Sequence, residues 1–261
     1  MKLNHFRAGA GEPLLLIHGI GSQWQMWEPV LDRLTPHREI IAIDLPGFGA
    51  TPRPLAAIPA GVDSLTSLVS GFLDEIGVQR PHVAGNSLGG LISLELARRG
   101  RVRSVTALSP AGFANRRESV LTRANLWVAV RGARLSAPQA EALLRPRISR
   151  VLALNLFVAH PTRITPGQAA EAVRALADAP WFDSTLPTVA PHAFTVNGAI
   201  DLPITIAWGE KDRVLVPRQA GRAARLLPNA RVITLSGCGH VPTYDDPAQV
   251  AEVLLQGSSP A

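Results

Sequence analysis

The sequence is poor in cysteine and has no long hydrophobic run. Its 261 residues include one cysteine, Cys238, which excludes an internal disulfide and any metal site made of cysteines alone. We expect its thiol to be buried. The apolar stretches, such as 14–17 and 40–43, fall far short of the roughly 20 residues that a membrane-spanning helix needs. The N-terminus shows no apolar segment before a cleavage site. We therefore expect a cytoplasmic protein without an integral membrane segment, stabilised by its core.

Aromatic residues are also scarce, at 5%. The net charge of +6 is accompanied by no nucleic-acid recognition motif, so we expect no nucleic-acid partner. The histidines are scattered without metal-ligand spacing, and phosphate-loop and dinucleotide motifs are missing. The sequence predicts no metal and no cofactor, and it does not indicate an oligomeric state.

The positive charge is concentrated in one segment. Residues 113–187 hold 10 arginines and 5 acidic residues, whereas the rest of the chain is nearly balanced. We expect most of these arginines to form a solvated face. Two alternatives are that one of them binds an anionic end of the substrate, or that the segment rests on an anionic lipid surface.

Short apolar runs alternate with helical patterns in the first and last parts of the chain. This alternation is typical of βαβ units and predicts a parallel sheet covered by helices. The expected strands are 14–18, 39–44, 82–85, 104–109, 204–208 and 232–235, and the expected helices are 24–34, 65–76, 88–99, 218–227 and 248–255.

The strand pattern is missing from residues 113–187, where helical stretches are separated by prolines. Helices inserted between two strands of a parallel sheet are best interpreted as a cap over the carboxyl ends of the strands. The expected domains are a core of residues 1–112 and 188–261 and a helical cap of residues 113–187. A separate helical domain is the alternative.

Residues 85–89 read GNSLG at the junction of a predicted strand and a predicted helix. In this context the pattern G-x-S-x-G predicts a nucleophile elbow, in which Ser87 sits on a strained turn and glycines on either side leave room for the backbone. An ordinary serine in a glycine-rich turn is the alternative. A serine hydroxyl also needs a base to accept its proton and an acid to orient that base.

The predicted base is His240. It ends the sequence SGCGH (236–240), which follows the last predicted strand and has two glycines that let a loop carry the imidazole over the sheet edge. The predicted acid is Asp212, just beyond the carboxyl end of strand 204–208, with Glu210 as the alternative. Asp245 and Asp246 look like caps of the final helix.

The chain resembles the α/β-hydrolase fold superfamily from about residue 14 to residue 255. The resemblance is carried by HGIG (18–21), DLPGFG (44–49), GNSLG (85–89), GEKD (209–212) and GH (239–240). It implies a doubly wound, mostly parallel sheet of eight strands, with the cap inserted after the sixth. It also implies a structural turn at 44–49, and an oxyanion hole formed by the backbone N–H groups of Ile20 and Leu88.

The resemblance narrows the chemistry but leaves alternatives. Ser87 argues against haloalkane dehalogenases and epoxide hydrolases, which have Asp at the elbow. The elbow also resembles that of C–C hydrolases of aromatic degradation. However, the chain lacks their Gly-Pro-Gly after HG (18–19), and Val241 replaces the Trp that often follows the catalytic histidine. Hydrolysis of a small-molecule ester therefore ranks first, C–C or enol-lactone hydrolysis second, and a non-catalytic ligand-binding protein third.

Large apolar residues near the oxyanion loop, in the helical segment and after His240 are candidates for the substrate pocket. Burial in the core is the alternative interpretation. The candidates are Trp24, Trp27, Trp127, Phe157, Trp181 and Val241.

Overall fold

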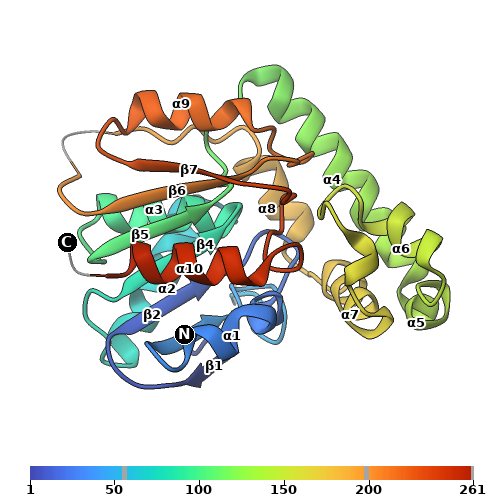
Figure 1. Cartoon of the computed structure of the whole chain (residues 1–261), viewed down its shortest axis with the longest axis horizontal. Helices are drawn as coiled ribbons and strands as arrows, with labels where there is room; N and C mark the ends of the chain where they lie inside the picture. The colour runs from blue at the N-terminus through green and yellow to red at the C-terminus, as the bar shows by residue number, and fades with distance from the viewer. Residues whose placement is uncertain (55–57, 197–199, 260–261) are drawn as a thin grey trace.

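The computed structural model describes residues 1–54, 58–196 and 200–259, and a twisted sheet lies at its centre (Figure 1). The strands occur in the spatial order β1-β3-β2-β4-β5-β6-β7. β1 pairs with β3 in antiparallel register, and all other pairs are parallel. The strands are β1 (His5–Ala8), β2 (Pro13–Ile17), β3 (Glu39–Ile43), β4 (His82–Asn86), β5 (Ser104–Leu108), β6 (Ile204–Gly209) and β7 (Arg231–Leu235).

The mostly parallel, doubly wound fold is confirmed, but the predicted strand count is wrong for the described residues. The sheet has seven strands rather than eight, and the helical insertion follows β5, the fifth strand in chain order, rather than the sixth. The first strand in chain order is β1, which lies at the edge of the sheet beside β3. That strand, β1, was not predicted, because its four residues show no run of buried apolar side chains.

Helices cover both faces of the sheet because the strand side chains alternate between two apolar clusters. Leu15 and Ile17 of β2 join a cluster with helices on one face, whereas Leu14 and Leu16 join a cluster on the other. The first face carries α2 (Val62–Glu75), α3 (Leu88–Arg98) and α9 (Arg218–Leu226), and the second carries α1 (Glu28–Leu34) and α10 (Pro247–Gly257).

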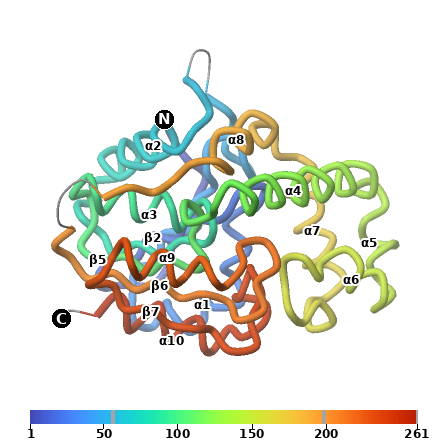
Figure 2. The backbone as a smooth tube through the Cα atoms, turned by 90° about the horizontal axis from the view of Figure 1, so that it is seen from above, coloured from blue at the N-terminus to red at the C-terminus, as the bar shows by residue number. Residues whose placement is uncertain are grey.

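The described residues between β5 and β6 form five α-helices, namely α4 (Arg116–Ser136), α5 (Ala140–Leu143), α6 (Arg147–Leu154), α7 (Pro166–Ala177) and α8 (Phe182–Val189). Capping boxes at Asn115 and Thr165 define the starts of the two longest. Figures 1 and 2 show α4 to α7 projecting beyond one end of the sheet. These four helices share a small apolar cluster of their own. No helix within the described ranges is both long and apolar enough to cross a bilayer.

Helix α8 packs into the core of the body and, among the described residues, contributes nothing to the small cluster that α4 to α7 share. Phe182, Leu186 and Val189 belong to the cluster that also contains α2 and α3. The expected domain boundary at residue 187 therefore falls inside α8, at a proline within the helix.

Candidate active site

Ser87 lies between β4 and α3 in a strained backbone conformation, with φ 56° and ψ −114°. A positive φ is costly for a residue with a β-carbon and must be imposed by the surroundings. The Ser87 N–H donates to the carbonyl of Leu108 at 3.0 Å. A β-carbon on Gly85 would overlap the backbone of Gly89, and one on Gly89 would overlap the carbonyl of Ile17. The two glycines thus allow the tight strand-to-helix crossing that projects Ser87 from the sheet.

Asp212 and His240 meet at the carboxyl ends of β6 and β7. His240 Nδ1 lies 2.8 Å from Asp212 Oδ2, and both residues are buried. The other carboxylate oxygen of Asp212 accepts N–H bonds from Val214 and Leu215, each at 2.8 Å. Because an ionised carboxylate only accepts hydrogen bonds, Nδ1 of His240 carries the proton, and Nε2 is left free to act as a base.

Ser87 and His240 line the same cavity. No hydrogen bond joins their side chains within the described part of the chain; such contacts are often long without a substrate. The side chain of Asn86 holds the two segments together, since its Nδ2 donates to the His240 carbonyl at 2.8 Å and to the Leu108 carbonyl at 3.1 Å. Sequence analysis did not single out Asn86, although it lies inside the elbow motif.

Glu210, the alternative acid, points elsewhere. Its carboxylate accepts the N–H of Gly237 at 2.7 Å and lies on the exposed side of the loop before His240. It therefore shapes that loop without contacting the imidazole.

Asp245 does not cap the final helix as the sequence predicted; that role belongs to Asp246, which accepts the Gln249 N–H at 2.9 Å. Asp245 is buried. Its carboxylate accepts three backbone N–H groups, from Gly239 at 2.8 Å, Ala159 at 2.9 Å and His160 at 2.7 Å. It thereby ties the loop of the candidate base to the segment after α6. Sequence spacing gave no signal for this role, because two of its three partners, Ala159 and His160, lie about 85 residues away along the chain.

The segment after β2 lies against Ser87. The closest atom to a β-carbon placed on Gly19 would be Cβ of Ser87, at 3.2 Å. Within the described residues, the backbone N–H groups of Ile20 and Leu88 donate to no other protein group, and an N–H in the first turn of a helix is commonly free for an anion. These are the two donors that the resemblance assigns to an oxyanion hole.

His18 holds this segment in place as a neutral imidazole. Its Nδ1 lies 2.7 Å from the Gly19 carbonyl, and its Nε2 accepts the N–H of Leu45 at 2.9 Å. Burial lowers the pKa of His18 below its usual value, although the Asp44 charge acts in the opposite direction. Asp44 in turn accepts the N–H groups of Trp24 and Ala50 at 2.8 and 2.9 Å. The turn at 44–49 therefore has a structural role beneath the candidate oxyanion segment.

The cavity above Ser87 has a volume of about 390 Å³. Most of its walls are apolar and come from α4, α6 and α7, with further side chains from the loops after β2 and β7. Phe157 and Val241, two of the residues proposed for the substrate pocket, line this cavity. The main apolar wall residues are Met26, Leu126, Leu154, Val158, Ile164, Val173, Leu176 and Val214.

The four tryptophans proposed for the pocket do not line this cavity. Trp24 stacks on Phe6 with ring centroids 5.1 Å apart. Trp27 is buried in the core between the sheet and α1. Trp127 is 48% exposed on α4, and Trp181 packs against the backbone of Gly47. Periodicity could not distinguish these positions from cavity walls.

Charge is nearly missing from the described walls of the cavity. Glu171 is the one carboxylate there, and the described lining residues include no arginine or lysine. Glu171 accepts a hydrogen bond from Gln23 at 2.9 Å. Burial, reinforced by the nearby Glu171 and Glu28 carboxylates, raises the pKa of Tyr244, so its hydroxyl remains protonated. The walls thus favour an apolar, uncharged ligand over an anionic one.

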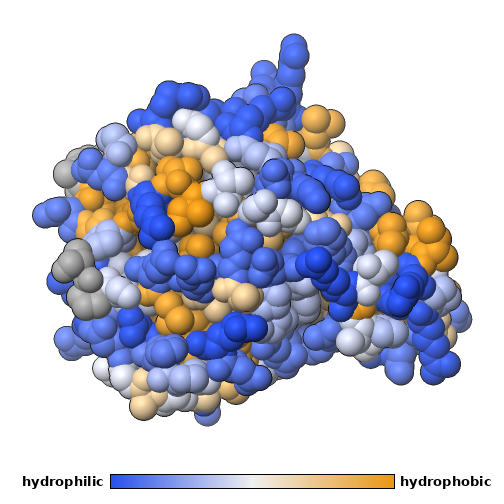
Figure 3. Space-filling model, in the orientation of Figure 1, coloured by the Kyte–Doolittle hydropathy of each residue, from blue (hydrophilic) through white to orange (hydrophobic). Residues whose placement is uncertain are grey.

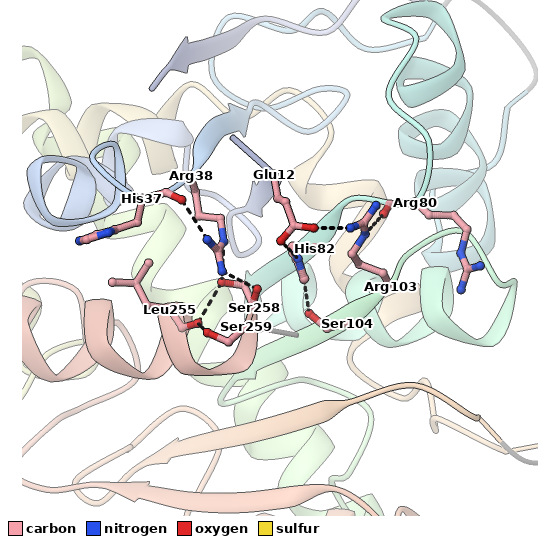
Figure 4. Close-up of polar contacts among 10 residues, drawn as sticks. All are labelled: Glu12, His37, Arg38, Arg80, His82, Arg103, Ser104, Leu255, Ser258 and Ser259. Carbon is pink, nitrogen blue, oxygen red and sulfur yellow. Dashed lines mark hydrogen bonds and ion pairs between the residues drawn. The ribbon is translucent and has the colours of Figure 1, made fainter. Parts of the chain in front are cut away.

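Another cluster of a serine, a histidine and a carboxylate, made of Ser104, His82 and Glu12, lies at the opposite end of the strands (Figure 4). His82 lies 2.7 Å from the Ser104 hydroxyl and 3.3 Å from the Glu12 carboxylate, which also pairs with Arg103 at 2.5 Å. Ser104 is only 2% exposed, and it lies within a regular strand. A substrate carbonyl has no access to it, so this cluster ties the amino ends of β4 and β5 together.

Cys238 is buried two residues before His240, as expected. Burial, with a further contribution from the Asp245 and Asp246 carboxylates, raises its pKa to about 12. The thiol is therefore protonated near neutrality and packs as a small apolar group. Among the residues that the structure describes, no three His, Cys, Asp or Glu side chains come close enough to hold a metal ion.

Comparison with known proteins finds relatives with several chemistries. The 2-hydroxy-6-oxo-2,4-heptadienoate hydrolase of Pseudomonas putida is 38% identical over 117 residues, which span 43% of this chain and less than half, 42%, of that protein. The epoxide hydrolase EphH of Mycobacterium tuberculosis is 31% identical and matches 70% of this chain and 87% of its own length. A thermophilic esterase from Thermogutta terrifontis has a similar structure, with a TM-score of 0.75 at 20% identity, covering 97% of this chain and 92% of the esterase.

The family profile described as the Alpha/beta hydrolase family matches residues 14–253. The matched region contains the elbow, the inserted helices and the loops that carry Asp212 and His240. It also contains nearly all of the parallel sheet. The chain therefore belongs to the alpha/beta hydrolase family and is a hydrolase.

Proposed function

We propose that this hydrolase cleaves carboxylic esters through an acyl-enzyme, with Ser87 as the nucleophile, His240 as the base and Asp212 as the acid that orients it. The observation that carries this proposal is the strained Ser87 in one cavity with a histidine whose Nδ1 lies 2.8 Å from a buried carboxylate. A serine with φ above zero at the start of a helix is unusual unless its side chain must be presented to a ligand.

The reaction follows from the roles of these groups. Ser87 Oγ attacks the ester carbonyl carbon while its proton passes to Nε2 of His240, and Asp212 stabilises the resulting imidazolium. The N–H groups of Ile20 and Leu88 stabilise the oxyanion, a contribution of about 3 kcal/mol per donor in comparable sites. The alcohol leaves with the proton from His240. Water then attacks the acyl-enzyme with His240 again as the base, and the carboxylic acid is released.

The apolar cavity supports a neutral ester with an apolar acyl chain. Helices α4, α6 and α7 supply much of its wall, and together with α5 they share a small apolar cluster. In this proposal they form the cap over the active site. The cap then extends from α4 to α7, and α8 belongs to the body. The substrate is a small molecule held mainly by apolar contact and oriented by the few polar groups near Ser87.

Cleavage of a carbon–carbon bond is the second candidate, favoured by the partial match to the Pseudomonas putida hydrolase. A dienoate substrate carries a carboxylate, which would meet Glu171 and no described arginine or lysine in this cavity. Burying an unpaired carboxylate is strongly unfavourable. Because the described cavity walls carry no positive side chain of arginine or lysine, a neutral ester fits the cavity better than a dienoate, and ester cleavage is the preferred proposal.

The test is hydrolysis of p-nitrophenyl esters with a series of acyl chains, compared with a 2-hydroxy-6-oxo-dienoate, by wild type and the Ser87→Ala variant. We expect Ser87-dependent ester turnover with a preference for medium acyl chains. A fluorophosphonate should label wild type and not Ser87→Ala. Faster turnover of the dienoate would establish the second candidate, and a folded protein with neither turnover nor labelling would indicate a non-catalytic binding protein.

A further inference from the structure

The inserted helices carry an unusual outer surface. Helix α4 buries one face, with Leu126 and Val130 at its centre, and exposes large apolar side chains on the opposite face. Leu135 is 87% exposed and Trp127 is 48% exposed. Eight of the twelve large exposed apolar side chains found among the described residues lie on or between α4 and α6. We call these eight the outer α4–α6 face; they are Val120, Leu121, Trp127, Val128, Leu135, Leu143, Ile148 and Leu152.

Arginines are interspersed with these apolar side chains. Arg117 and Arg131 lie on the outward side of α4, and the guanidinium of Arg131 stacks 3.9 Å from the centre of the Trp127 ring. Further exposed arginines flank α6. The one acidic residue of α4, Glu118, is buried and pairs with Arg218 of α9. The outer α4–α6 face is thus apolar and cationic, and Figure 3 shows hydrophobic and hydrophilic surface side by side at this end of the molecule.

The cavity reaches the surface beside this face. Four residues that line the cavity are exposed, one on α4, two on α6 and one on α7, namely Gly132, Leu152, Ala153 and Ala172. Leu152 belongs both to the cavity wall and to the outer face, where it is 74% exposed. The part of the cavity rim that α4 and α6 form is therefore bordered by the same apolar and cationic surface.

We infer that the outer α4–α6 face docks onto an anionic lipid surface. Its apolar side chains enter the boundary between headgroups and acyl chains, its arginines contact lipid phosphates, and Trp127 lies at the headgroup level. Docking in this orientation places the α4 and α6 part of the cavity rim against the lipid. A second copy of the chain is a poorer partner for this face, because two arginine-rich surfaces would repel each other.

Vesicle flotation tests this inference without relying on ester turnover. The protein carries Ser87→Ala, so that no lipid is consumed, and it is mixed with vesicles of phosphatidylcholine alone or of phosphatidylcholine with phosphatidylglycerol. We expect binding to the anionic vesicles to be at least about tenfold stronger and to weaken as salt is added.

Two pairs of substitutions locate the contact, on the same Ser87→Ala background. Leu135→Glu with Ile148→Glu removes apolar contacts, and Arg117→Glu with Arg131→Glu reverses two charges. Each pair should lower vesicle binding at least about tenfold. Arg225→Glu, an exposed charge reversal on α9, is the matched control and should change binding less than about twofold.

Three outcomes would overturn the inference. One is that both pairs of substitutions leave vesicle binding unchanged although circular dichroism shows folded protein. Another is equal binding to anionic and neutral vesicles. The third is a dimer of the protein in sedimentation experiments that becomes a monomer when Leu135→Glu and Ile148→Glu are introduced. That result would make the face an interface between two copies of the chain. If the variant with Leu135→Glu and Ile148→Glu unfolds, the variant with Arg117→Glu and Arg131→Glu still tests whether the outer α4–α6 face binds lipid, because both arginines are exposed.

Discussion

Asp245→Asn should impair both stability and catalysis, because Asp245 joins the loop of His240 to the segment after α6. The carboxylate accepts three buried N–H groups, those of Gly239, Ala159 and His160. An asparagine amide has one oxygen, so at least one N–H loses its acceptor and faces an NH₂ group instead. An unsatisfied buried donor costs about 1–3 kcal/mol, and the remaining bonds lose the strengthening effect of the charge.

The expected loss in the free energy of unfolding is therefore about 3 kcal/mol, which corresponds to a fall in Tm of roughly 10 °C for a domain of this size. Because Gly239 directly precedes His240, the imidazole should also lose its alignment with Ser87. Misplacing a catalytic group by about 1 Å costs on the order of 100-fold in rate. We expect kcat on a preferred ester to fall between about 10-fold and 100-fold at temperatures where the variant is fully folded.

Asp246→Asn is the matched control, since it makes the same charge change at the next residue. Asp246 caps α10 through the Gln249 N–H, and asparagine is about as good an N-cap as aspartate. The control should keep kcat within about twofold and lose less than about 0.5 kcal/mol. The assays are thermal unfolding and steady-state ester hydrolysis. Loss of stability with an unchanged kcat would refute the positioning role of Asp245, and a variant as stable as wild type would refute the account of the three bonds.

Four other predictions follow from the site. The pKa of His18 is below its usual value in the folded protein, so the imidazole is protonated more readily in the unfolded chain. The free energy of unfolding should therefore decrease as the pH is lowered below about 6.5, by up to about 1.4 kcal/mol per pH unit. His18→Gln should flatten this slope in urea titrations between about pH 5 and pH 7, and an unchanged slope would exclude His18 as its source. Gly85→Ala should prevent folding or cost more than about 3 kcal/mol, since its β-carbon meets the Gly89 backbone, whereas Gly71→Ala in open space on α2 should raise stability by roughly 0.5–1 kcal/mol; similar chemical-denaturation midpoints for the two variants would contradict this. With a pKa of about 12, Cys238 should react with iodoacetamide on the order of 100-fold more slowly in the native than in the unfolded protein, as measured by mass spectrometry, and rapid native labelling would show that the thiol is accessible. Ala129→Phe fills part of the cavity wall on α4 and should shift the ratio of kcat/KM values toward shorter acyl chains by roughly fourfold per excluded methylene; an unchanged chain-length profile would place the acyl chain elsewhere.

The sequence by itself determined the fold class and the family. Short apolar runs joined by helical patterns identified six of the strands, because strands buried on both faces read as near-continuous apolar stretches. The elbow was also predictable, because it is a contiguous motif. Its glycines are needed to avoid clashes between backbone atoms only a few residues apart in the sequence. The same holds for the positions of Asp212 and His240 at the carboxyl ends of strands, because parallel strands bring these ends to one edge of a sheet.

Only the tertiary structure decided which side chains meet. The short edge strand β1 was missed because its pairing with β3 leaves no buried run in the sequence. Trp24 and Trp127 share their residue type with good cavity walls, yet one stacks on Phe6 and the other faces outward on α4. The role of Asp245 depends on N–H groups from two segments, one of them about 85 residues away along the chain. Local patterns report burial and periodicity, whereas such partners are set by the packing of distant segments, and no local pattern encodes that packing.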